Sequence, residues 1–295
     1  MWCQTVAKLK DQNPTVAIEQ LCKLFGKTRH AYYDNTWRAK DNLLKDEIIL
    51  QLVASIRTAL PRIGTRKLHH MLKSQLQEHC LEIGRDYLFA LLAENKLLIR
   101  TRKRKVTTTQ SHHWMRKYSN LIREQKLIRP EQIWVSDITY IKIIKGFVYL
   151  SLITDAYSRK IVGYNLQRDL SSEGSLKALD MALSARMKPW QPLIHHSDRG
   201  VQYCSKSYVD RLTEHNIAIS MTENGDPYEN ALAERVNGIL KTEFNLYITQ
   251  SGFEETCHRV EQSIYAYNQL RPHSSCDYLT PTTAHTLSGP IKKRW

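Results

Sequence analysis

The chain has 295 residues, 42% hydrophobic and 24% charged, which is ordinary for a soluble globular protein with two or three compact units. No apolar stretch approaches the ~20 residues that a membrane-spanning helix needs, and the first residues lack the apolar core of a secretory signal. The six cysteines are scattered without a CxxC pair, so we expect reduced, mostly buried thiols in a cytosolic protein. These features exclude membrane proteins and small disulfide-linked secreted domains.

The net charge of +14 is confined to the first part of the chain. Residues 1–130 contain 25 Lys and Arg against 11 Asp and Glu, whereas residues 131–295 contain 18 of each. Because solubility alone does not require such segregation, we expect a front half that binds a polyanion and a separate, neutral back half. A basic surface that is merely solvated is the alternative.

Helical patterns predominate in the front half. Residues 15–34 combine helix-like apolar spacing with a break at Gly26 and a second short segment, which is typical of a helix-turn-helix unit. Residues 43–59 have the pattern of one amphipathic helix. We therefore expect an N-terminal helical region over residues 1–60.

A second domain resembling a helix-turn-helix is expected over residues 61–106. Two helices there have basic side chains near their starts, at Arg66, Lys67 and Arg85. The start of a recognition helix is the part that meets base edges in the major groove. A basic run closes the domain and can follow DNA phosphates without reading sequence: Arg100, Arg102, Lys103, Arg104 and Lys105. Residues 107–128 have the polar, weakly periodic pattern of a linker.

The back half alternates strands and helices. Segments rich in β-branched and aromatic residues predict strands at 133–143, 147–159, 160–167, 192–198 and 217–221. The first three should pair as antiparallel neighbours because their links are short, and helices are expected at 171–186, about 205–215 and from about Tyr228. This order is found in RNase H-like folds. We expect an α/β RNase H-like catalytic domain over residues 129–290, a mixed five-stranded sheet with flanking helices, preceded by an all-α helix-turn-helix DNA-binding region.

Three carboxylates fall where such a fold can bring them together. Asp137 lies in the middle of the first strand, Asp198 at the end of the fourth, and Glu234 on the last of these helices. A charged residue inside a strand is costly unless it is paired or binds a metal. Two divalent ions about 3.5–4 Å apart catalyse phosphodiester chemistry on such clusters, and Mg²⁺ prefers oxygen ligands. We expect Asp137 to bridge both ions, with Asp198 and Glu234 each holding one side.

The spacing of these carboxylates resembles a known signature. Sixty residues separate Asp137 from Asp198 and thirty-five separate Asp198 from Glu234, as in the DDE motif of retroviral integrases and bacterial insertion-sequence transposases. More narrowly, the chain resembles the OrfB-type transposases of the IS3 family in WVSDITYI, TDAYSRKIVGY, HHSDRGVQY, NGDPYENALAERVNGILKTE and YNQLRPHSSCDYLTP, and in the front half in IGTRKL and IGRDYLFALLAENKL. One departure is Arg235, where the family pattern has Ser; we expect little loss, since this side chain points to another helix face.

The resemblance implies a transposase that nicks DNA at the 3′ ends of an insertion sequence and transfers the strands to a new site. It implies two Mg²⁺ ions, for which Mn²⁺ can substitute, and double-stranded DNA of the element ends and the target as partner. It further implies at least a dimer on DNA, fusion to or partnership with an upstream OrfA protein, and a place in the bacterial cytoplasm with the nucleoid. Lys241, seven residues after Glu234 and on the same helix face, matches a family position that contacts the DNA end.

Two other classes share part of these features. A catalytically silent DNA-binding regulator would have the basic front half, but it would not need three carboxylates at these spacings. An RNase H-like nuclease would share the metal site, but it would not need the helix-turn-helix units. The combination favours the transposase.

Several polar residues have two interpretations. Asn230, one turn before Glu234, either helps to position DNA or water or caps the helix start. Asp155 is either a fourth metal ligand or, as we favour, a structural hydrogen-bonding residue. Of His195 and His196, we expect one to pack and the other to approach the active site, because neighbours on a strand face opposite ways.

The remaining polar residues are expected to have structural or surface roles. We expect Glu229 and Glu243 to be solvated. We expect the C-terminal segment YAYNQLRPHSS to pack against the sheet rather than contact DNA directly, including its residues Tyr265, Tyr267, Asn268, Arg271 and His273.

Overall fold

The computed structural model of the chain describes residues 2–99, 115–123, 125–223 and 230–292, except for the side chain of Ala39. The chain divides into two compact units. Unit 1 comprises Met1–Ser55 and Leu72–Lys96, and unit 2 comprises Ile56–Met71 and Leu97–Trp295. Two of the three divisions fall inside the helices over 29–59 and 65–78, and the third falls after Lys96. None falls at residue 60 or 106, and the expected boundaries of the helical domains stay a prediction.

Unit 1 is helical, as the apolar spacing predicts. It contains α1 (Trp2–Gln12), α2 (Ile18–Lys23), most of α3 (Arg29–Ala59), the second half of α4 (Thr65–Glu78) and α5 (Arg85–Glu94). Val6, Leu21 and Cys22 form a small buried cluster of α1 and α2. Tyr87 of α5 donates a hydrogen bond to Asp46 of α3, which ties the later helices to the long one.

The long helix α3 differs from the sequence prediction. The sequence predicts a short helical segment before residue 34 and a separate helix over 43–59, whereas α3 runs through both for 31 residues. No Gly or Pro occurs within α3, so no residue there breaks the helix. The expected break at Gly26 is confirmed, because this residue has a φ of +63°, which glycine adopts without strain.

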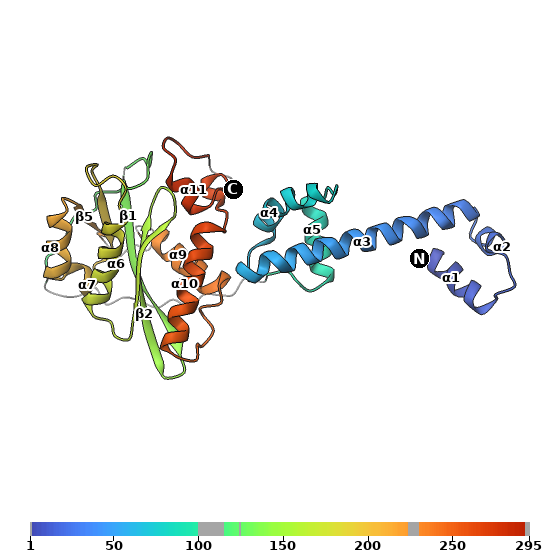
Figure 1. Cartoon of the computed structure of the whole chain (residues 1–295), viewed down its shortest axis with the longest axis horizontal. Helices are drawn as coiled ribbons and strands as arrows, with labels where there is room; N and C mark the ends of the chain where they lie inside the picture. The colour runs from blue at the N-terminus through green and yellow to red at the C-terminus, as the bar shows by residue number, and fades with distance from the viewer. Residues whose placement is uncertain (1, 100–114, 124, 224–229, 293–295) are drawn as a thin grey trace. The chain divides into compact units, whose positions relative to one another are not determined.

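Unit 2 carries a mixed five-stranded sheet in the order β3-β2-β1-β4-β5 (Figure 1). The strands are β1 (Ile133–Ile143), β2 (Gly146–Asp155), β3 (Ile161–Gln167), β4 (Ile194–Ser197) and β5 (Ala218–Met221). The first three pair as antiparallel neighbours, β4 runs parallel to β1, and β5 runs parallel to β4. This is the RNase H-like arrangement that the sequence predicts.

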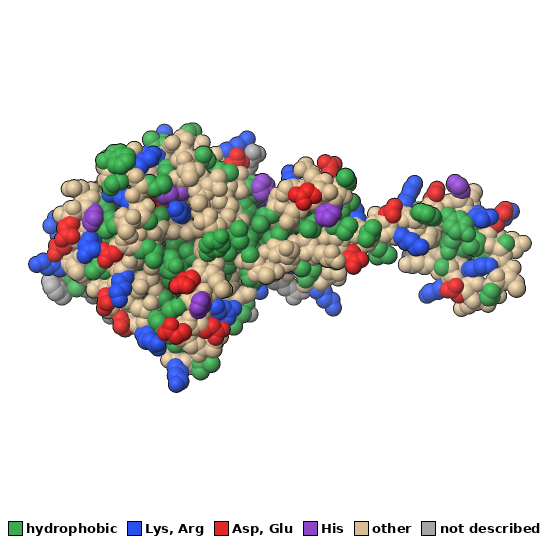
Figure 2. All heavy atoms as spheres, viewed as in Figure 1, with side chains coloured by type: hydrophobic (Ala, Val, Ile, Leu, Met, Phe, Trp, Pro, Cys, Tyr) green, Lys and Arg blue, Asp and Glu red, His purple; other side chains and the backbone are tan. Residues whose placement is uncertain are grey.

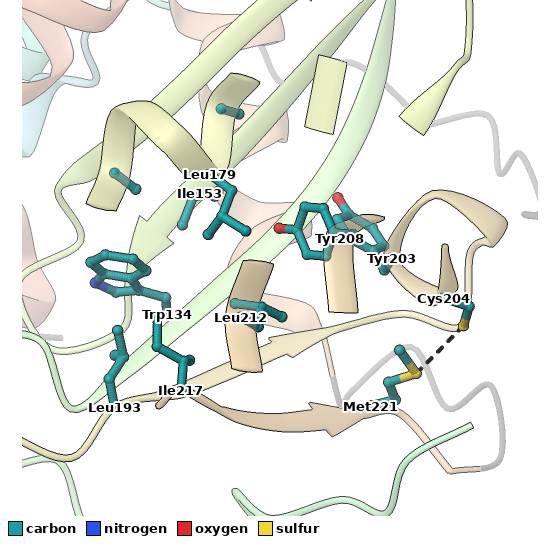
Figure 3. Packing of buried hydrophobic residues seen from close by; sticks show 12 residues of the cluster. Trp134, Ile153, Leu179, Leu193, Tyr203, Cys204, Tyr208, Leu212, Ile217 and Met221 are labelled. Carbon is teal, nitrogen blue, oxygen red and sulfur yellow. Dashed lines mark hydrogen bonds between the residues drawn. The ribbon is translucent and has the colours of Figure 1, made fainter. Parts of the chain in front are cut away.

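Helices cover both faces of the sheet. They are α6 (Ser172–Ser184), α7 (Val201–Cys204), α8 (Lys206–Glu214), α9 (Ala231–Glu243), α10 (Phe253–Gln269), the 3₁₀ helix η1 (Ser274–Cys276) and α11 (Pro281–His285). Neighbouring residues of β1 point to opposite faces. Trp134 packs in the core that includes Leu179 of α6 and Leu212 of α8 (Figure 3), whereas Ile133 and Val135 pack with Ala233 of α9. The strand β1 therefore contributes side chains to the cores on both faces of the sheet.

The surface of unit 2 agrees with its composition. On the face seen in Figure 2, basic and acidic side chains are mixed over the part that carries the sheet, in keeping with the equal numbers of the two in residues 131–295.

All six cysteines are free, and three of them are buried: Cys22, Cys204 and Cys276. Among the described residues, no helix is both long and apolar enough to cross a bilayer.

Candidate active site

Two neighbouring strands place the first two carboxylates side by side. Asp137 lies in the middle of β1, and Asp198 follows directly after β4. The two strands pair in parallel with Val135 opposite His196, so the same register, continued by two residues, brings Asp137 opposite Asp198. Both side chains are half-buried.

The helix α9 brings the third carboxylate to the same edge. Glu234 lies in the first turn of α9 and is exposed. The residue before it, Ala233, is buried against Ile133 and Val135 of β1. Packing of this small residue lets the start of α9 lie close to the strand that carries Asp137.

Two asparagines tie α9 to β1. Asn230 Nδ2 donates to the carbonyl oxygen of Ser136 at 3.2 Å, and Asn237 Nδ2 donates to Asp137 Oδ2 at 2.7 Å. The two lie on one side of the helix with Glu234 because they are four residues before it and three after it. The sequence analysis missed Asn237, although its spacing from Glu234 is a signal that could have identified it.

Asn230 stands at the N-cap position of α9, but its side chain makes no capping hydrogen bond. The capping interpretation is therefore wrong, and a role in positioning DNA or water stays a prediction. Among the described residues, Oδ1 of Asn230 and Oδ1 of Asn237 are buried without a hydrogen-bond partner. Two amide acceptors are thus available beside the carboxylates.

The three carboxylates share one electrostatic site. Burial raises the pKa of Asp137 to about 7, and the charges of Asp198 and, to a smaller extent, Glu234 contribute to this rise. Hydrogen bonds from Asn237 and from the backbone N–H of Ile138 lower the pKa of Asp137 but do not cancel the rise. The ionised carboxylates therefore repel one another.

A divalent cation would relieve this repulsion. Carboxylates are the oxygen ligands that Mg²⁺ prefers, and the waters that Mg²⁺ keeps need acceptors, such as the buried amide oxygens of Asn230 and Asn237. In the part of the chain that the structure describes, no three His, Cys, Asp or Glu side chains are already arranged as a metal-binding group. The donors thus fit a metal in chemistry and charge, and their oxygens would have to draw together around it.

Tyr203 of α7 is a second residue that the sequence analysis did not single out. Its hydroxyl is buried, with no hydrogen-bond partner among the described residues. Burial raises the pKa of Tyr203 well above its usual range, and Tyr208 and the charges of Asp137 and Asp198 raise it further. The hydroxyl therefore stays protonated and lies within electrostatic reach of both aspartates.

The two histidines before Asp198 lie on opposite sides of β4. His195 Nε2 makes hydrogen bonds with Ser136 Oγ at 2.7 Å and Tyr208 Oη at 2.9 Å, and burial lowers the pKa of His195 to about 3. The expected packing role is therefore confirmed for His195. His196 is also fully buried and is held by Ser220 Oγ at 2.8 Å, so its approach to the active site stays a prediction.

Asp155 has the structural role that we favoured. Its side chain is fully buried. Oδ2 accepts the backbone N–H of Glu131 at 2.7 Å, and Oδ1 accepts the backbone N–H and the hydroxyl of Ser158, both at 2.8 Å. These bonds close the turn after β2.

Lys241 lies two turns after Glu234, with its Nζ 5.1 Å from the centre of the Tyr140 ring. Of the candidate DNA-binding residues of the front half, Arg66 is exposed and Arg85 is exposed beside Asp86, with which it pairs at 2.9 Å. Their DNA contacts stay predictions. The basic run lies outside the described residues: Arg100, Arg102, Lys103, Arg104 and Lys105.

The prediction that Glu243 is solvated is wrong. Arg271 Nε and Nη2 donate to its two carboxylate oxygens at 2.8 and 2.7 Å, and Lys67 Nζ lies 3.6 Å from Oε1. The side chains of Lys67 and Glu243 are each only 20% exposed, so the charge of Lys67 is already paired within unit 2. Arg271 is buried, and a buried guanidinium requires such a partner. The other glutamate, Glu229, lies outside the described residues.

The C-terminal segment packs as expected. Tyr267, Asn268, Arg271 and His273 are all buried, and Asn268 exchanges two hydrogen bonds with the backbone of Ile161 in β3. Tyr265 is the exception, because 64% of its surface is exposed. This segment therefore packs against the sheet at β3.

Residues 128–227 and 215–281 match two family models, both described as an integrase core domain. These matches and the fold define an RNase H-like integrase core, the class of polynucleotidyl transferases that act on DNA. A relative from Shigella sonnei, the insertion element IS600 uncharacterized 31 kDa protein, is 34% identical over 269 residues, which are 88% of this chain and 96% of the relative. The chain belongs to the IS3 family of insertion-sequence transposases.

Other similar proteins cover about half of the chain. The transposase for insertion sequence element IS629 from Shigella sonnei is 36% identical over 57% of this chain and 56% of its own length. Transposase InsF for insertion sequence IS3fB from Escherichia coli (strain K12) is 35% identical over 52% of this chain and 53% of its own length. A solved structure of the HTLV-2 integrase catalytic core domain in complex with magnesium is 22% identical, with a TM-score of 0.44, and covers 54% of this chain and 99% of that one.

Proposed function

We propose that this chain is a DDE transposase that nicks DNA at the 3′ ends of an insertion sequence and joins the freed strands to a target, using Mg²⁺. The observation that carries the proposal is that Asp137 and Asp198 lie side by side on paired strands, with Glu234 at the start of the helix packed against them. Burial raises the pKa of Asp137 to about 7, and the charges of Asp198 and Glu234 contribute to this rise. A group of carboxylates that repel one another is stabilised when a cation binds between them.

Asp137 would hold both of two Mg²⁺ ions, with Asp198 and Glu234 on either side; Mn²⁺ would substitute. When bound, such ions activate the attacking oxygen and stabilise the leaving one. The chain's own residues position the reactants. Asn237 orients Asp137 through the 2.7 Å hydrogen bond to Oδ2, and Lys241 would contact a phosphate of the DNA end.

The proposed partners follow from the chemistry. The substrate is double-stranded DNA, both the element ends and the target, and joining two ends requires at least a dimer on DNA. An OrfA protein, fused or separate, would contribute to recognition of the ends. Such a substrate places the reaction in the bacterial cytoplasm, at the nucleoid.

Strand transfer of a labelled oligonucleotide carrying the element end tests the proposal, with Mg²⁺ or Mn²⁺ and with the OrfA protein added in a parallel series. Wild type should give joined products, whereas Asp198→Asn and Glu234→Gln should give none and still bind DNA. Glu254→Gln, a change at an exposed residue paired with Arg168, is the matched control and should behave as wild type. If wild type and the three variants all bind DNA but give no joined product, both without and with the OrfA protein, the chain is a DNA-binding regulator. Cleavage without joining would indicate a nuclease.

A further inference from the structure

A cavity of about 250 Å³ lies on the side of α9 that faces away from the catalytic carboxylates. Its floor is apolar and comes from Leu232, Val236 and Ile239 of α9. Arg235 of α9 and Arg159, which precedes β3, line the same cavity. The cavity therefore combines an apolar surface with two guanidinium groups.

Among the described residues, only neutral groups hold the side chain of Arg159 in place. Its Nη1 donates to the carbonyl oxygen of Ala156 at 2.6 Å, and its Nε donates to Ser275 Oγ at 3.4 Å. Its own carbonyl oxygen accepts the hydroxyl of Tyr267 at 2.9 Å. The guanidinium is therefore fixed by neutral groups, and its positive charge is not neutralised by them.

Arg235 is exposed and, within the described part of the chain, makes no hydrogen bond or ion pair. The buried carboxylate nearby, Glu243, is already paired with Arg271 and Lys67. Within the part of the chain that the structure describes, these pairs leave Arg159 and Arg235 without a carboxylate partner, so both arginines contribute positive charge to the cavity.

His273 also lines the cavity, and the positive charge there affects its pKa. Its pKa is lowered well below the usual range, first by burial and then by four cations: Arg271, Lys67, Arg159 and Arg235. The imidazole therefore stays neutral and adds no charge of its own. A ligand of this cavity should combine an anionic group for the guanidiniums with a flat or apolar part for the floor.

We infer that the cavity binds one nucleotide of the DNA strand, with its phosphate between Arg159 and Arg235 and its sugar or base on the floor formed by Leu232, Val236 and Ile239. This inference rests on the proposed function, since it takes the ligand from the DNA substrate of the same enzyme. Arginine is suited to phosphate because its planar fork can donate two parallel hydrogen bonds.

The cavity lies close enough to the carboxylates for one DNA strand to reach both. Glu234 and Arg235 are consecutive, so their side chains leave α9 about 100° apart. A helix with its side chains is about 10–12 Å across, which is about three nucleotides at the ~3.4 Å rise of one strand. The nucleotide in the cavity would therefore lie within a few positions of the reacting phosphate.

The test measures DNA affinity at a series of salt concentrations in EDTA, where no metal-dependent reaction occurs. Arg235→Ser introduces the residue that the family pattern has at this position and should lower the log–log salt slope by about 0.7–0.9, the value for one phosphate contact. Arg235→Lys should keep most of the slope. Arg168→Ser is the matched control, because Arg168 is exposed and paired with Glu254, and it should leave the slope near that of wild type.

Arg235→Ser, Arg235→Lys and Arg168→Ser should unfold at the same temperature as wild type, because both arginines are exposed. Equal slopes for Arg235→Ser and wild type would overturn the inference. So would an equal decrease for Arg168→Ser, since the loss would then reflect net charge alone. If Arg235→Ser changes only the oligomeric state measured by light scattering, the cavity holds a protein segment instead.

Photocrosslinking places the nucleotide. A photoactivatable base is moved along the oligonucleotide, and the crosslinked peptides are mapped. Crosslinks to residues 231–239 or 267–275 from one or two neighbouring positions support the inference, and crosslinks only to other peptides contradict it. The salt slope and the crosslinks measure DNA binding and test the nucleotide site, whereas strand transfer tests the proposed function. Failure of one proposal can therefore be distinguished from failure of the other.

Discussion

The two halves of the chain differ in charge and in the geometry that their proposed roles require. Residues 1–130 carry an excess of 14 positive charges, whereas residues 131–295 are neutral and contain the sheet with its three carboxylates. Affinity for DNA phosphates grows with the number of cations and tolerates loose geometry. Phosphodiester chemistry instead requires a few oxygens at fixed positions. A chain can therefore acquire DNA affinity from local composition, but it needs long-range strand pairing to build the reactive site.

The largest expected effect tests the basic half. Replacing Arg100, Arg102, Lys103, Arg104 and Lys105 by Gln should lower the log–log salt slope of DNA binding by about 4 and weaken binding at physiological salt by about a hundredfold. Arg168→Gln with Lys177→Gln is the control, because both residues are exposed and paired with carboxylates in the neutral half. An unchanged slope in the quintuple variant would mean that the basic run is only a solvated surface.

The second prediction concerns the point where the two halves meet within unit 2. Glu243→Gln leaves Arg271 buried and unpaired and releases Lys67 of α4, so the free energy of unfolding should fall by about 3 kcal/mol. Urea unfolding followed by tryptophan fluorescence measures this loss. Glu254→Gln removes an exposed pair and should cause little change. Equal effects of the two substitutions would mean that the pairing of Lys67 and Arg271 does not stabilise unit 2.

The third prediction sharpens the role of geometry in the reactive half. Asn237→Ala removes the hydrogen bond to Asp137 and should lower the rate of strand transfer about 10–100-fold, as for other groups that orient metal ligands. It should also raise the Mg²⁺ concentration that gives half-maximal rate. DNA affinity in EDTA should stay that of wild type. A lower rate with an unchanged Mg²⁺ requirement would contradict an orienting role.

The smallest effect is on pH dependence. Burial holds the pKa of His195 at about 3 in the folded protein, whereas an unfolded histidine has a pKa of about 6.5. The unfolded chain therefore binds more protons between these values, so stability is complete above about pH 6.5 and is lost as the pH falls. Lowering the pH from 7 to 5 should cost about 2 kcal/mol of unfolding free energy through this residue. Urea unfolding of His195→Gln at both pH values should show a smaller loss, and an equal loss would contradict the assignment.

Much of the neutral half could be predicted from the sequence because its signals are local. Alternation along β1 distinguishes the face of Trp134 from that of Ile133 and Val135, and short links fix antiparallel neighbours. The order of strands then determines which ends meet, and this placed Asp137 and Asp198 on adjacent strands. The length of α3 is not predicted, because the pattern indicates a separate segment before residue 34 and a helix over 43–59, although no Gly or Pro lies between them.

The tertiary structure alone decided which polar side chains meet. Glu243 has the sequence context of a solvated residue, and only its approach to Arg271, 28 residues later, buries it. Asn237 acquires its role only from the crossing of α9 over β1, 100 residues away in sequence. In the sequence, Arg235 is only a departure from the family pattern, whereas in the fold it lines a cavity with Arg159. Local patterns determine strands and helices because neighbouring residues set them, whereas the pairing of charges depends on distances that exist only after the chain has folded.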